Sequence, residues 1–114
     1  MARPCFRERL MVWSVAIAYF FAGAFLVNAV PHFVQGVSGR TFPSPFARPP
    51  GRGESSPLIN VLWGFVNLVV GYLLLVRVGD FDPRSSVDML LPGVGGLMMA
   101  VLLARTFGRV HAKK

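Results

Sequence analysis

Three apolar segments, each long enough to cross a bilayer, make up more than half of this 114-residue chain. They run over residues 10–30, 58–78 and 87–107, which is 21 residues each. At about 1.5 Å per helical residue, each segment matches a hydrocarbon core about 30 Å thick. The sequence therefore predicts an all-α fold with three transmembrane helices, forming a single membrane domain over residues 1–114.

Composition and charge agree with a membrane protein. With 54% hydrophobic residues and a mean hydropathy of +0.55, the chain has more apolar surface than a soluble domain of this size buries. The net charge is +7, and nearly all basic residues lie outside the three segments. This distribution favours contact with anionic lipid headgroups over nucleic-acid binding. We expect a multi-pass protein of the inner cell membrane with no nucleic-acid partner.

The first segment also has features of a signal peptide, because arginines precede it and Ala22-Gly23-Ala24 resembles a cleavage site. Apolar residues continue to Val30, however, well beyond a typical signal-peptide core. A retained helix is the favoured interpretation.

Local signals define the starts of the second and third helices. Ser56 fits an N-cap, and Pro57 fits the first helical position, where its missing N–H costs nothing. The spacing of Ser85 and Asp88 resembles a capping box, which favours a capping role for Asp88 over a proton-carrying one. Pro92 removes a helical hydrogen bond, so a kink or an interfacial turn is expected there.

Small and amide side chains mark the candidate packing faces. Asn60, Gly64, Asn67 and Gly71 share one stripe of the second helix, and Gly96, Ala100 and Ala104 share one stripe of the third. Helices in lipid associate by close approach at small residues and by interhelical hydrogen bonds. Because the connection between these two helices is short, we expect them to form an antiparallel hairpin with facing stripes. The same faces could support a homo-oligomer or a larger membrane complex.

Charge gives a weak bias for orientation. With three crossings, the loop 31–57 and the C-terminus share one side of the membrane, which carries seven basic residues against five on the other. The positive-inside rule then places the C-terminus in the cytoplasm.

The loop 31–57 combines Pro and Gly with three phenylalanines, which predicts a loop that rests on the membrane interface or folds back over the helix ends. Asn28, His32, Asn60 and Arg105 lie near the same membrane face and are expected to form a polar cluster beneath it. One interpretation is hydrogen bonding between helix ends. The other is a pocket for a small ligand or headgroup, in which His32 binds or exchanges a proton.

Catalytic, cofactor and metal-ligand motifs are missing from the sequence. The Gly36–Arg40 stretch fails the Gly-x-Ser-x-Gly pattern at its last position, and no Cys/His cluster has metal-ligand spacing. We therefore expect a non-enzymatic protein with no catalytic residues, no cofactor and no metal site.

One pattern resembles a known kind of protein: Asn28-x-x-Pro31-His32-Phe33, then Phe42-Pro43-x-Pro45-Phe46, then Asn60-x-x-Trp63-Gly64. It is similar to that of small bacterial multi-pass membrane proteins with no known activity, so the resemblance implies no function. From the residues, we expect an accessory, assembly or lipid- or partner-binding component of the membrane. The alternative is a subunit of an oligomeric small transporter or channel, because three helices alone cannot enclose a pore.

Overall fold

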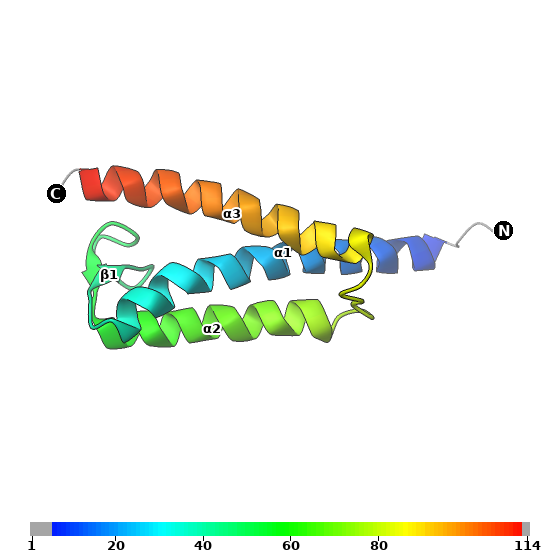
Figure 1. The fold of residues 1–114 in the computed structure, drawn as a ribbon, viewed down its shortest axis with the longest axis horizontal. Coiled ribbons are helices and arrows are strands. Elements are labelled where there is room, and N and C mark those ends of the chain that lie inside the picture. The colour runs from blue at the N-terminus through cyan, green and yellow to red at the C-terminus, as the bar shows by residue number, and fades with distance from the viewer. Residues whose placement is uncertain (1–5, 113–114) are drawn as a thin grey trace.

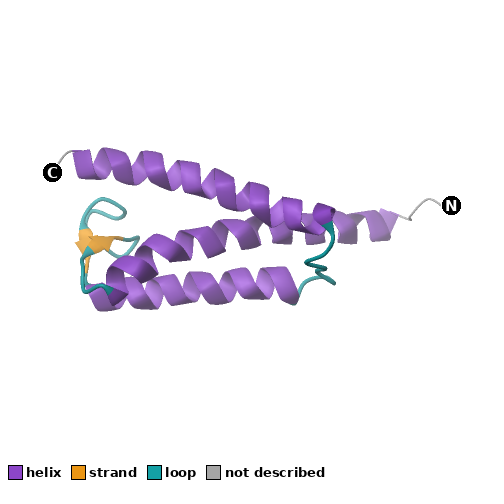
Figure 2. Cartoon of the chain, viewed as in Figure 1, coloured by secondary structure: helices purple, strands orange, loops and turns teal. Residues whose placement is uncertain are grey.

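Three helices and one short two-stranded sheet make up the fold. The computed structural model describes the backbone of residues 6–112 and the side chains of residues 12–112. In chain order the elements are α1 (Phe6–Val37), β1 (Phe42–Pro43), β2 (Glu54–Ser55), α2 (Pro57–Val76) and α3 (Ser86–Ala112) (Figure 1). Figure 2 shows the sheet as a small addition within the connection between α1 and α2. The predicted helical fold class is confirmed.

Each helix is long and apolar enough to cross a membrane. The qualifying segments are Val12–Val37, Pro57–Val76 and Ser86–Ala112, with 26, 20 and 27 residues. At 1.5 Å per residue, these are about 39, 30 and 40 Å long. The whole molecule is a rod of 59 × 24 × 23 Å. The length of the rod follows from the helices, which all run along it.

Small side chains fill the interior of the rod, and large apolar side chains cover its outside. The buried residues include Ala18, Ala22, Ala24 and Ala29, whereas Leu62, Phe65, Leu97 and Leu102 are among the exposed ones. A water-soluble protein has the opposite arrangement. This distribution is typical of helices that pack closely through small residues and present larger ones to lipid.

Helix α1 lies between the other two helices and packs against both of them (Figure 1). The expected facing of the second and third helices is therefore wrong, because each presents its small-residue stripe to α1. The reason is that α1 carries small residues on two sides. A Cβ on Gly71 of α2 would lie 3.1 Å from the Ala22 carbonyl oxygen, and one on Gly96 of α3 would lie 3.4 Å from the Gly23 oxygen.

The stripe on α2 is buried along its whole length, at Asn60, Gly64, Asn67 and Gly71. Its glycines allow close contact with α1. A Cβ on Gly64 would lie 2.8 Å from the backbone nitrogen of Phe33. The stripe therefore sets the distance between α1 and α2.

The stripe on α3 differs from the expected one. Gly95 and Gly96 are buried, and a Cβ on Gly95 would lie only 1.9 Å from the backbone oxygen of Phe20. Ala100 and Ala104 are exposed, so the expectation that Ala100 packs against a neighbouring helix is wrong. The physical reason is geometric: α3 crosses α1 near Gly95 and separates from it toward the C-terminal end (Figure 1).

Helix α1 does not end at Val30 but continues through Pro31 to Val37. The loop therefore begins at residue 38, not at residue 31 as expected. Pro31 lies inside this helix, where its missing N–H removes one helical hydrogen bond. A Cβ on Gly36 would lie 2.7 Å from the Pro57 oxygen, which shows how closely the extension approaches the start of α2. Pro92 likewise lies inside α3, which continues through it, so the interfacial turn expected as one alternative does not occur there.

The predicted helix starts are confirmed. The Ser56 hydroxyl accepts a hydrogen bond from the Ile59 backbone N–H at 3.2 Å, and Pro57 is the first residue of α2. The Ser85 hydroxyl accepts from the Asp88 N–H at 3.2 Å. The Asp88 carboxylate accepts from the Asp82 N–H at 3.0 Å, so it holds the turn before α3 and completes no capping box.

Candidate functional site

The connection between α1 and α2 folds back over the helix ends at one end of the rod (Figure 1). Strands β1 and β2 pair antiparallel, with Phe42 opposite Ser55. The Ser44 and Ser55 hydroxyls hydrogen-bond to each other, and the Thr41 hydroxyl donates to the Glu54 carboxylate. We call residues 38–56 the cap. These hydrogen bonds give the cap a defined structure, which a flexible linker would lack.

Asn60, at the start of α2, connects the cap to the helices. Its side chain is fully buried, and its Nδ2 donates to the backbone oxygens of Phe42, Ser55 and Ser56 at 2.9, 3.2 and 3.1 Å. Three carbonyl acceptors around one amide nitrogen fix the orientation of the amide, so Oδ1 must face the other way. There it lies 2.9 Å from Nδ1 of His32.

This geometry makes Nδ1 of His32 a hydrogen-bond donor. Because Asn60 Oδ1 can only accept, the proton of a neutral His32 ring is on Nδ1, and Nε2 is left as an acceptor. No described residue forms a hydrogen bond with this Nε2. The ring is 3% exposed and lies edge-on to three aromatic rings, with centroid distances of 5.5 Å to Phe42, 6.4 Å to Trp63 and 6.1 Å to Phe107.

A second polar pair lies deeper in the bundle. Asn28 Nδ2 donates to Asn67 Oδ1 at 2.9 Å, and Asn67 Nδ2 donates to the Trp63 backbone oxygen at 2.8 Å. Two pairs therefore take the place of the expected cluster: His32 with Asn60, and Asn28 with Asn67, which was not among the four expected residues. Each such hydrogen bond in a membrane bundle contributes about 0.6–2 kcal/mol.

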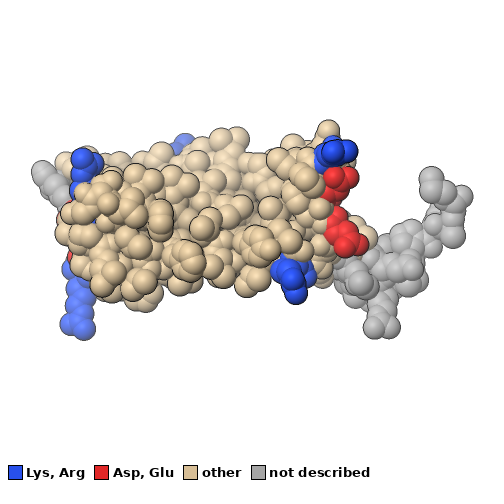
Figure 3. Space-filling view, turned by 60° about the horizontal axis from the view of Figure 1, so that its bottom comes forward, with Lys and Arg blue, Asp and Glu red and all other residues tan. Residues whose placement is uncertain are grey.

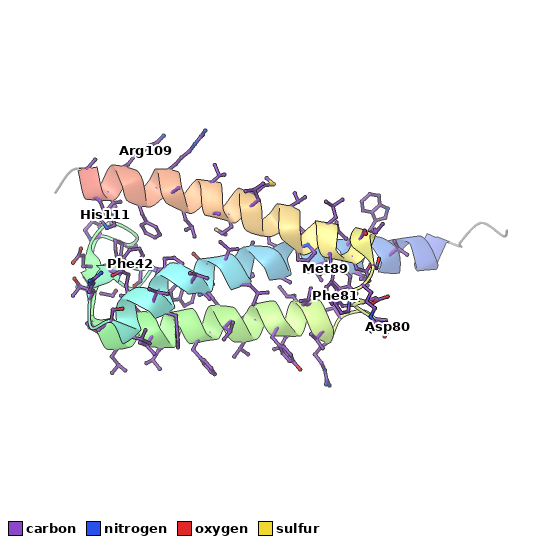
Figure 4. All side chains as sticks on the ribbon, in the orientation of Figure 1. Phe42, Asp80, Phe81, Met89, Arg109 and His111 are labelled. Atoms are coloured by element: carbon purple, nitrogen blue, oxygen red, sulfur yellow. The ribbon has the colours of Figure 1, made fainter. Side chains whose placement is uncertain are left out.

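Arg105 does not belong to this cluster, because its side chain is exposed. It was expected there because the third helix ends near the same membrane face. The separation of α3 from α1 at this end leaves room for the cap, and Phe107 faces the cap instead, with its ring centroid 4.6 Å from that of Phe42. Figure 4 labels Phe42 in the cap, at the same end of the rod as His111 of α3.

The aromatic residues around His32 are the part of the site that sequence reasoning missed. The sequence predicts that Phe42 and Phe46 lie at the membrane interface or over the helix ends, but it does not place them or Trp63 against His32. The ring of Phe46 packs edge-on against Trp63 at 5.3 Å, so the cap contributes aromatic groups to the site from two positions. The sequence feature that could have indicated these contacts is the density of aromatic residues in the loop that follows His32.

Two hollows lie at this end of the molecule. An inner cavity of about 170 Å³ is bounded by cap and helix residues, among them His32, Pro43, Trp63 and Phe107. An outer groove of about 630 Å³ lies between the cap and the end of α3, lined by Pro49, Arg52, Thr106 and Arg109 among others. Arg109 projects outward from α3 (Figure 4).

Charge differs between the two ends of the rod. The described arginines at the cap end, all exposed, are Arg40, Arg48, Arg52, Arg105 and Arg109, and the one described carboxylate there is Glu54. The acidic residues Asp80, Asp82 and Asp88 gather at the opposite end, beside the connection between α2 and α3 (Figure 3). Arg3, Lys113 and Lys114, which contribute to the predicted charge bias, lie outside the described residues.

Comparisons with protein families, with curated proteins and with solved structures find no match to this chain. The resemblance to small bacterial membrane proteins therefore stays a prediction from the sequence.

Proposed function

We propose that this chain is a multi-pass integral protein of the inner cell membrane that acts by binding and not by catalysis. In this proposal its cap end lies against the anionic headgroups of the cytoplasmic leaflet, where it serves as an accessory or assembly component. The apolar surfaces of α1, α2 and α3 support insertion, since water would leave their large exposed side chains unfavourably solvated.

The observation that carries the proposal is the charge difference between the two ends. Five exposed arginines surround the cap, with Glu54 as the one described acid, whereas the opposite end carries three aspartates beside only two described arginine side chains that are exposed, Arg77 and Arg84. A basic side chain near an anionic membrane surface contributes about 1 kcal/mol to binding. Arginine can also place its aliphatic stem along lipid while its guanidinium group reaches the headgroups.

The test is selective retention of anionic lipid. The purified full chain is exchanged into mixed micelles with equal amounts of phosphatidylglycerol and phosphatidylcholine, and the lipids that remain bound are measured by mass spectrometry. We expect phosphatidylglycerol to be enriched. Replacing Arg48 and Arg52 by Gln removes about 2 kcal/mol of attraction, which corresponds to about a thirtyfold loss of preference.

The matched control is the double variant Arg77→Gln and Arg84→Gln, which removes the same charge from the acidic end. It should leave the preference for phosphatidylglycerol unchanged. Equal retention of both lipids by the unmodified chain, or equal losses in the two double variants, would contradict binding at the cap end.

A further inference from the structure

The inner cavity beneath the cap opens toward the outer groove, with which it shares Gly51 and Thr106, but its walls differ from those of the groove. Its volume is about 170 Å³, and its walls include the faces or edges of Pro43, Pro45, Trp63 and Phe107. An apolar cavity of about 150 Å³ in another protein is large enough to hold benzene. The size and the walls therefore suit one six-membered aromatic ring, which prefers edge-to-face contact with other rings.

The polar groups of the cavity restrict what such a ring must carry. His32 lines the cavity, and its Nε2 is an acceptor because Nδ1 donates to Asn60. Trp63 lines the same cavity, so its indole N–H can report on a ring that binds there. The imidazole acceptor suits a ring that carries a hydrogen-bond donor, and a hydroxyl group is a small substituent that donates.

His32 is only 3% exposed, and the rings of Trp63 and Phe107 lie edge-on to it at centroid distances of 6.4 and 6.1 Å. We propose that this cavity is a binding site for a phenolic ring, such as a small phenol or the headgroup of a quinol, with its hydroxyl group on His32.

Site-specific detection is possible because the chain has two tryptophans, Trp13 and Trp63. Trp13 is exposed near the opposite end of the rod, so the Trp13→Phe variant assigns the two ¹⁵N indole signals of the full chain in detergent micelles. We expect p-cresol to shift the Trp63 signal saturably and to leave the Trp13 signal in place. Toluene, which has the same ring and methyl group without the hydroxyl, should bind about three- to tenfold more weakly.

A matched pair of variants tests the role of His32. In His32→Asn the side-chain amide occupies the place of Nδ1, so the bond to Asn60 is kept while the Nε2 acceptor is lost. We expect its affinity for p-cresol to fall to that for toluene, with toluene binding unchanged. A phenol with a dodecyl chain distinguishes the sources: tighter binding than p-cresol at equal micellar concentration indicates a membrane-borne quinol, and weaker binding indicates a free phenol.

Several outcomes would overturn the proposal. A Trp63 signal that does not saturate, or that moves in parallel with Trp13, would show partition into the micelle and a cavity filled by water only. Equal affinities of the unmodified chain for p-cresol and toluene would exclude recognition of the hydroxyl group, even if His32→Asn failed to fold.

Discussion

Removing the amide of Asn60 should release the cap while leaving the helix bundle assembled. Asn60→Ala takes away the donor to the Phe42 and Ser55 oxygens and the acceptor of His32 Nδ1–H. The Ser56 oxygen keeps a partner, because it also accepts from the backbone N–H of residue 60 at 3.1 Å.

The magnitude follows from these contacts. A buried imidazole N–H without an acceptor costs about 1–3 kcal/mol, and each lost hydrogen bond to the cap costs about 0.5–1.5 kcal/mol. The cap of Asn60→Ala should therefore be less stable by about 2–6 kcal/mol. Opening of the cap then becomes at least about thirtyfold more frequent, since 1.4 kcal/mol corresponds to a factor of ten.

Limited trypsin digestion in detergent measures this opening, because Arg40 and Arg52 lie in the cap and each is followed by a residue other than proline. Cleavage at these two sites should accelerate in Asn60→Ala. The control is Asn67→Ala, which removes a buried amide from the same face of α2 but touches Asn28 and not the cap. Unchanged cleavage in Asn60→Ala, or equal acceleration in the two variants, would refute the assignment of Asn60 as the residue that holds the cap.

Three further outcomes are expected. Gly95→Ala should lower the thermal stability in detergent by several degrees, because a Cβ there would meet the Phe20 oxygen. Gly93→Ala should leave the thermal stability unchanged, because a Cβ there would meet nothing within 4 Å. Equal shifts in the two variants would contradict close packing of α3 on α1. His32→Asn should be more stable in the same assay than His32→Gln, because the Gln amide corresponds in position to Nε2 and cannot replace the bond to Asn60. The reverse order of stability would exclude the inferred donor at Nδ1. Reporter fusions to the two termini should report opposite compartments, with the C-terminus in the cytoplasm, and a common compartment would exclude three crossings.

The sequence by itself determined the number of helices, their apolar character and the starts of α2 and α3. These are local properties: the hydropathy of a 20-residue window, a serine before Pro57, and Ser85 three residues before Asp88. The stripe at Gly64 and Gly71 could also be identified, because helical spacing alone places such residues on one face.

Tertiary structure decided what each face meets. A stripe of small residues indicates that a face is buried, but its partner depends on how residues far apart in sequence approach in space. The second and third helices consequently both pack on α1, and Ala100 is exposed because α3 has already separated from α1 at that point. The same applies to Arg105, whose position along the chain gave its end of the rod but not the exposure of its side chain.

The site depended most on tertiary structure. Nothing local to Asn60 indicates that its amide binds the backbone of Phe42 and Ser55, since the partners are carbonyl groups that every residue carries. Only the fold of the cap brings them to within 2.9 and 3.2 Å. Hydrophobicity therefore determines from sequence that this chain forms apolar helices, while directional hydrogen bonds and close packing, which need coordinates, determine how those helices enclose His32.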